Sequence, residues 1–194
     1  HLLNYNLSLA RLPFVLIYTL TIPLTVTLVR KVSPRVGWWT GILLVISPWH
    51  LALSRRAELP WQPWLHLDLT KFLDRFFDFL SPGYLFLTGD QTFALTANSG
   101  LLLSVTLVTL LITLVTVKKF DRLFWLSIKL ILFGTLLASL QPYFGKTSAL
   151  IIALFGWTIL LGWGIAKSLS RFPWLLFIFI PIFAYQSINS LHNY

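Results

Sequence analysis

The chain has 194 residues, of which 57% are hydrophobic and only 11% are charged, and its mean hydropathy is +0.79. This composition lies well outside the balance of soluble domains and predicts an integral membrane protein. The net charge of +9 does not indicate nucleic-acid binding, because the basic residues lie mostly in short runs between apolar spans, as topology signals do. The absence of cysteine excludes disulfides, thiolate catalysis and cysteine metal sites.

Six segments are apolar and long enough to cross a bilayer, for which a helix needs about 20 residues, or about 17 at the least. In chain order they cover residues 12–29, 36–53, 100–117, 123–140, 148–166 and 172–187. Pro173 and Pro181 interrupt the last segment. The predicted fold is therefore a single all-α, polytopic membrane domain over residues 1–194.

The connections between these segments predict their orientation. Basic residues gather at 30–35, 118–122 and 167–171, and such short cationic loops face the cytoplasm by the positive-inside rule. The N-terminus, segment 54–99 and loop 141–147 should then lie on the outer side. Because the chain has neither methionine nor a signal-peptide pattern, we expect it to be a fragment whose upstream part holds a further span.

The second span closes on Ile46-Ser-Pro-Trp-His50-Leu-Ala-Leu-Ser-Arg55, the most site-like stretch of the chain. Pro48 permits a kink, so that His50 and Arg55 could line one outer vestibule. The guanidinium of Arg55 offers a fork of donors for phosphate oxygens, and His50 could bond the same lipid headgroup or a sugar hydroxyl. In the alternative interpretation, Arg55 only anchors the chain to lipid phosphates and His50 packs at the interface.

The outer segment 54–99 contains five of the six acidic residues. Within it, apolar residues from Leu69 to Leu80 recur at helical spacing. The other face carries Asp68, Lys71, Asp74, Arg75 and Asp78. This pattern predicts an amphipathic helix in the membrane interface, which Ser81-Pro82-Gly83 should stop.

Three further residues are candidates. Asp90 lies in an outer loop beside a glycine, where a carboxylate could act as a base or contact a sugar or a divalent cation, the one cofactor left open. Lys146, in the loop 141–147, could add positive charge for a phosphate. Lys129 is the only charge inside a predicted span, and we expect its long side chain to extend to the nearby headgroups.

Zinc binding and nucleophilic catalysis find no support in the sequence. The four histidines, at positions 1, 50, 66 and 192, are scattered and show no paired ligand spacing. The serine, histidine and acidic residues form no nucleophile motif, and no glycine-rich phosphate loop is present. No metal site is predicted, and the catalytic residues stay unassigned.

Three patches of the chain carry a resemblance to a known family. The first runs from Leu9-Ala-Arg11-Leu-Pro13-Phe through the cationic turn to the stretch that ends at Arg55. The second is Phe79-Leu-Ser-Pro82-Gly-Tyr-Leu-Phe-Leu-Thr-Gly-Asp90. The third runs from Ser148-Ala-Leu-Ile to Gly164. Together they resemble the branch of GT-C glycosyltransferases that contains dolichyl-phosphate-mannose protein mannosyltransferases and aminoarabinose transferases.

The resemblance implies an enzyme of the bacterial plasma membrane that takes a sugar from a polyprenyl-phosphate carrier. It would transfer the sugar, with inversion, to a protein or glycolipid acceptor on the extracytoplasmic face. In that chemistry an outer carboxylate acts as general base, and basic side chains stabilise the phosphate leaving group. Arg55 matches the motif's arginine and would contact the phosphate, with His50 beside it and Asp90 at the family's Gly-Asp position.

The chain departs from the family in two respects. The family's acidic catalytic motif lies in the first outer loop, which would precede His1, so we expect this chain to lack the base. The family also has several more spans between the Ser-Pro-Trp-His end and the Gly-Asp segment. Two other hypotheses stay open: a non-enzymatic subunit that binds lipid phosphate or acts as a scaffold, and a transporter fragment, which should have more polar residues in its spans.

Overall fold

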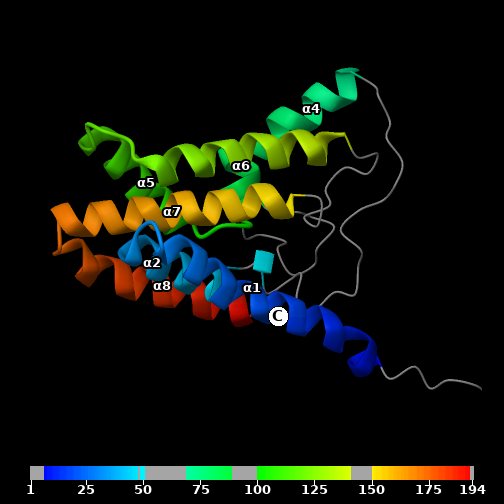
Figure 1. Ribbon diagram of the computed structural model, residues 1–194, viewed down its shortest axis with the longest axis horizontal. Helices are drawn as coiled ribbons and strands as arrows, with labels where there is room; N and C mark the ends of the chain where they lie inside the picture. The colour runs from blue at the N-terminus through cyan, green and yellow to red at the C-terminus, as the bar shows by residue number, and fades with distance from the viewer. Residues whose placement is uncertain (1–6, 48, 51–68, 89–99, 141–149, 193–194) are drawn as a thin grey trace, which may run out of the picture.

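The computed structural model describes residues 7–47, 49–50, 69–88, 100–140 and 150–192. Within these ranges the fold is entirely helical and contains no strand (Figure 1). The elements are α1 (Leu7–Arg30), α2 (Pro34–Ile46), α4 (Leu69–Leu80), the π-helix η1 (Gly83–Thr88), α5 (Ser104–Thr116), α6 (Arg122–Ser139), α7 (Ile151–Arg171) and α8 (Leu175–His192). The predicted all-α class is confirmed.

Helix α7 lies at the centre of the bundle, where α2, α5 and α6 all pack against it (Figure 1). Three glycines of α7 make these contacts close. A Cβ added to Gly156 would lie 2.9 Å from α6, one on Gly162 would lie 2.6 Å from α2, and one on Gly164 would lie 3.2 Å from α5. In membranes, small residues hold helices together because they let the backbones approach each other. Each of these three neighbours therefore has its own glycine contact on α7.

Buried hydroxyl groups link α5 to α7. The Thr113 hydroxyl lies 2.7 Å from the carbonyl oxygen of Gly164 and 2.7 Å from the hydroxyl oxygen of Ser168. Ser168 also lies within bonding distance of α5, because its hydroxyl donates to the carbonyl oxygen of Thr109 at 3.0 Å. Such interhelical hydrogen bonds hold one register, because sliding either helix would leave buried polar groups without partners.

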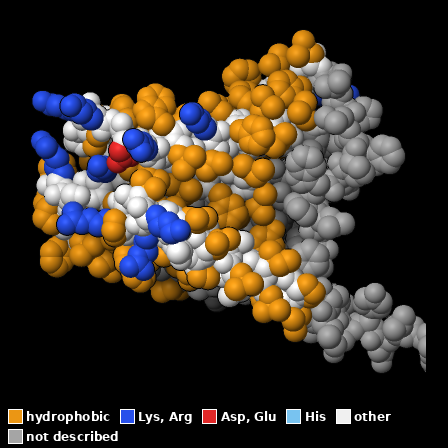
Figure 2. Space-filling view, viewed as in Figure 1, with side chains coloured by type: hydrophobic (Ala, Val, Ile, Leu, Met, Phe, Trp, Pro, Cys, Tyr) orange, Lys and Arg blue, Asp and Glu red, His pale blue; other side chains and the backbone are white. Residues whose placement is uncertain are grey.

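The outer surface of the bundle is apolar. Large apolar side chains are exposed on α1, α5, α6 and α8, among them Leu20 at 65%, Phe133 at 57% and Phe177 at 82%. Figure 2 shows such side chains over much of the described face. A soluble monomer rarely leaves apolar surface this extensive in water. The surface therefore fits a bundle that is surrounded by lipid.

Two helices, α6 and α7, are long and apolar enough to cross a membrane. In the apolar window of α7, 72% of the residues are buried, against 39% in α6, so α7 is enclosed by other helices while α6 faces outward. The six predicted spans correspond in order to α1, α2, α5, α6, α7 and α8. Since α2 and α5 have only 13 residues each, or about 20 Å of helix, a crossing by all six stays a prediction.

The three basic connections lie together at one end of the bundle. Figure 1 shows the α1–α2, α5–α6 and α7–α8 connections at the left of the view, and Figure 2 shows lysine and arginine side chains gathered there. One ion pair joins the α5–α6 connection to the C-terminal part of α7, since the ammonium of Lys167 lies 3.3 Å from the carboxylate of Asp121. We call this part of the molecule the cationic end.

The predicted amphipathic helix is present as α4, which ends at Leu80, one residue before the predicted stop. It packs against α6 and exposes Leu69, Leu73 and Phe77 along one stripe. One assignment was wrong: Arg75, placed on the polar face, is buried. Arg75 lies one helical turn before Phe79, the other buried residue of α4, so this side of the helix is covered while Leu69, Leu73 and Phe77 are exposed.

Substitution of Gly134 by alanine should destabilise the bundle. This glycine of α6 faces α7, and an added Cβ would overlap the backbone nitrogen of Ala153. Overpacking of this kind costs about 1–3 kcal/mol, which thermal unfolding in detergent can measure. Gly83→Ala is the control, because its Cβ would meet only the Ser81 hydroxyl oxygen, at 3.9 Å. Equal midpoints for the two variants would contradict the close α6–α7 contact.

Candidate functional site

Two helices of the bundle stop short at the end opposite the cationic end. The second span was predicted to continue to residue 53, but α2 ends at Ile46 and Ser47 is extended, with φ −68° and ψ 127°. The residue before a proline is disfavoured in a helix, and Pro48 follows directly. Similarly, α5 begins at Ser104 and not at residue 100, because Leu103 is extended.

The non-helical residues after α2 and before α5 contact each other. The Ser47 hydroxyl donates to the carbonyl oxygen of Leu101 at 3.4 Å, and both residues are buried. Non-helical backbone at membrane depth is tolerated only where protein covers it or where it lines a cavity. In membrane transporters, helices interrupted in this way often surround a binding site. The interruptions therefore identify this end of the bundle as the candidate site.

The π-helix η1 packs against the non-helical residues that precede α5. The backbone N–H of Leu102 donates to the carbonyl oxygen of Leu85 at 2.8 Å, and the Ser104 hydroxyl donates to that of Phe86 at 2.7 Å. Gly100 lies so close to the Phe86 backbone that an added Cβ would overlap it. Short π-helical turns are rare in proteins, but those that occur are often found at functional sites. The segment 100–104 and η1 thus form one hydrogen-bonded unit.

Aromatic side chains pack the turn after α2, and also η1, against the first half of α7. Trp49 is fully buried and meets Phe155 edge to face, with ring centroids 5.3 Å apart. Phe86 of η1 meets Trp157 in the same geometry at 6.1 Å. Pairs of this kind contribute about 0.5–1.5 kcal/mol beyond the area they bury. The turn after α2 and η1 are therefore held against the same helix.

His50 is buried, with only 4% of its surface exposed. Its ring packs edge to face against Tyr18 and Trp49, with centroids 5.7 and 5.4 Å away. Its backbone N–H donates to the carbonyl oxygen of Ser47 at 3.1 Å and so closes the turn. In this structure His50 fastens the turn after α2 to α1.

The contact between His50 and Thr21 indicates which nitrogen of the imidazole carries the hydrogen. Nε2 of His50 lies 3.2 Å from the hydroxyl oxygen of Thr21. That hydroxyl has a single hydrogen, which it donates to the carbonyl oxygen of Tyr18 at 2.6 Å. We therefore assign the hydrogen to Nε2, which donates it to Thr21. Its Nε2–H group is satisfied within the protein.

Of the four candidate residues, the structure describes only His50. Arg55, Asp90 and Lys146 lie outside the described residues. No cluster of three or more histidine or acidic side chains that could hold a metal occurs within the described ranges. The sequence did not indicate Thr21, Phe155 or Trp157 as parts of this region, since their contacts join segments far apart in the chain and leave no local pattern.

Comparison of the chain with protein-family models, with curated proteins and with solved structures found no match. The fold and the site define a helical bundle with an apolar exterior, one cationic end and interrupted helices at the other end.

Substitution of Thr21 by valine should destabilise the protein, because the isosteric side chain removes the hydroxyl that lies 3.2 Å from Nε2 of the buried His50. Loss of one hydrogen bond costs about 0.5–1.5 kcal/mol, which a lowered midpoint of thermal unfolding would report. Thr19→Val is the matched control on α1, since the Thr19 hydroxyl is exposed and donates to the Val15 carbonyl in its own helix. A Thr21→Val midpoint no lower than the control's would show that this bond does not hold His50.

Proposed function

We propose that the chain is the carrier-binding part of a membrane glycosyltransferase that takes a sugar from a polyprenyl phosphate. The supporting observation is the convergence of the three patches that carry the family resemblance. The first contributes Trp49, which packs on Phe155 of the third, and the second contributes Phe86, which packs on Trp157 of the third. Segments that are distant in sequence thus meet at one end of the bundle, as parts of one site should.

Membrane embedding is the second element of the proposal. The apolar exterior and the cationic end together support a bundle that crosses the membrane with its basic connections in the cytoplasm. The end with the interrupted helices then faces the extracytoplasmic side. A bacterial plasma membrane fits this arrangement, since polyprenyl-phosphate sugars are used there on the outer face.

Each candidate residue has a proposed role. Arg55 binds the carrier phosphate, and Lys146 adds positive charge near it. Asp90 contacts the sugar or the acceptor. His50 acts as a positioning residue, because its Nε2 is engaged with Thr21 and its ring is buried. It would hold the turn from which the chain continues to Arg55.

The proposed transfer follows from these roles. The acceptor oxygen attacks the anomeric carbon of the sugar, and the bond between that carbon and the phosphate oxygen breaks. The phosphate leaves with the electron pair, and a guanidinium stabilises the charge that develops on it. A carboxylate must remove the acceptor's proton, and the family resemblance assigns this role to an acidic motif in the first outer loop. The four candidate residues would supply the carrier site.

A non-enzymatic lipid-phosphate-binding or scaffold subunit is the second candidate. It is favoured by the position of the acids: among the described residues, Asp74 and Asp78 lie on α4 and Asp121 lies at the cationic end. None of these belongs to the interrupted helices. An outer-loop carboxylate encoded upstream of His1 would favour the enzyme, and its absence would favour the subunit. A transporter is less well supported, because the α5 hydroxyls of Thr109 and Thr113 are bound to backbone carbonyls.

The substitution Arg55→Ala should weaken binding of a polyprenyl phosphate to the detergent-purified chain at fixed low salt. Losing a charge-assisted hydrogen bond to phosphate costs about 1.5–3 kcal/mol, or roughly ten- to a hundredfold in Kd. Binding can be measured by titration with the carrier phosphate and with a neutral polyprenol of the same length.

Arg56→Ala is the matched control, because it removes the same charge at the neighbouring position, which the family motif does not include. We expect it to leave the Kd nearly unchanged. An equal loss in both variants would mean that the two arginines act only as a general membrane anchor, and the absence of binding in the wild type would contradict the carrier site.

A further inference from the structure

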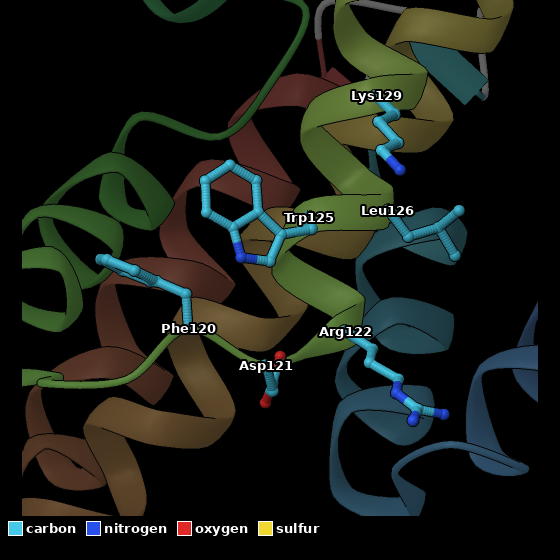
Figure 3. A pocket seen from close by; sticks show the side chains of 6 residues that line it. All are labelled: Phe120, Asp121, Arg122, Trp125, Leu126 and Lys129. Atoms are coloured by element: carbon cyan, nitrogen blue, oxygen red, sulfur yellow. The ribbon is translucent and has the colours of Figure 1, made fainter.

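A cleft at the cationic end lies apart from the candidate site. It has a volume of about 590 Å³ and opens beside the start of α6. Its lining residues are Phe120, Asp121, Arg122, Trp125, Leu126 and Lys129 (Figure 3). The proposed transfer uses none of these side chains.

Two cations and an indole share one face of α6 in this cleft. Arg122, Trp125 and Lys129 occupy positions i, i+3 and i+7 of the helix, which fall on the same side. All three are exposed, whereas Leu123 and Phe124 between them are buried. Figure 3 shows the Lys129 side chain extending back along α6 toward the Arg122 end. Figure 3 also shows the Arg122 guanidinium pointing away from Lys129, so these two exposed and flexible side chains must turn toward each other to hold one ligand.

The only acidic residue of the cleft has partners of its own. One carboxylate oxygen of Asp121 accepts the backbone N–H of Phe124 at 3.2 Å and so caps α6. The other lies 3.3 Å from the ammonium of Lys167. The negative charge of Asp121 is thus balanced by Lys167 and the helix N-terminus. Arg122 and Lys129 give the cleft a net positive charge.

An arginine followed three positions later by tryptophan recurs at every cationic connection. The pairs are Arg35 with Trp38, Arg122 with Trp125, and Arg171 with Trp174. The three tryptophans are 55–57% exposed, although Trp49 and Trp163 are fully buried. Exposed tryptophan beside basic residues is typical of the headgroup level of a membrane protein. The three pairs therefore place the cleft at the level of lipid headgroups.

We propose that this cleft binds the headgroup phosphate of an anionic phospholipid. The guanidinium of Arg122 and the ammonium of Lys129 bind the phosphate oxygens, while Trp125 and Leu126 contact the glycerol and the first acyl carbons. These apolar contacts favour a lipid over free phosphate. The inference rests on the membrane embedding proposed above and is independent of the polyprenyl-phosphate site at the other end.

The test compares phospholipid binding to the detergent-purified chain by native mass spectrometry. We expect retention of phosphatidylglycerol and little of phosphatidylcholine. Lys129→Gln should weaken phosphatidylglycerol binding about fivefold, and the double variant Arg122→Gln with Lys129→Gln about thirtyfold, as expected for one and two basic residues at an anionic surface. Both side chains are exposed, so the variants should fold.

Lys118→Gln is the matched control, because Lys118 is an exposed cation of the same connection that does not line the cleft. It should change phosphatidylglycerol binding by less than about twofold, since exposed charges outside the contact are screened. Equal weakening by Lys118→Gln and Lys129→Gln would overturn the site in favour of a general attraction. Binding of glycerol 3-phosphate as tight as that of phosphatidylglycerol, or no preference for the anionic lipid, would also overturn it.

Discussion

The close contact of three helices with α7 is the constraint on which the rest of the structure depends. Gly156, Gly162 and Gly164 have no side chains, so α6, α2 and α5 can each approach the α7 backbone. In a lipid environment, where apolar burial between helices contributes little, packing and interhelical hydrogen bonds must hold the bundle. The same helix provides Phe155 to the interrupted end and Lys167 to the cationic end. Both proposed lipid sites are therefore supported by one central element.

Much of the architecture was predictable because it follows from local properties of the chain. Apolar runs and basic connections depend on composition alone, and the stop of α4 before Ser81 follows from a Ser-Pro-Gly sequence. The early end of α2 has a local cause, because a proline at position 48 disfavours a helical conformation of Ser47, whereas the apolar pattern predicts a span that continues to residue 53. The extended Leu103 could not be predicted, because the backbone N–H of Leu102 and the hydroxyl of Ser104 donate to η1, which lies 15 residues or more earlier in the chain.

The site was only partly accessible from sequence for the same reason. His50 was recognised as unusual from its position beside Pro48 and Trp49, but its partner Thr21 lies 29 residues away on another helix. Periodicity cannot reveal such a pair. The structure gives His50 a role that the sequence left as one of two alternatives, a packed ring that joins α1 to the turn after α2. Burial of Arg75 likewise depends on how α4 packs on the rest of the bundle, which the local pattern of α4 does not contain.

Membrane embedding with opposed ends is the claim that all the proposals share, and the chain's lack of cysteine makes it directly testable. Single cysteines would replace Lys118 at the cationic end, Thr88 in η1 and the exposed Leu20 of α1, and would be labelled in oriented vesicles with a membrane-impermeant maleimide. We predict reaction of Lys118→Cys from the cytoplasmic side only, of Thr88→Cys from the opposite side only, and of Leu20→Cys from neither. Rapid labelling of Leu20→Cys, or labelling of the other two from one side, would contradict the account.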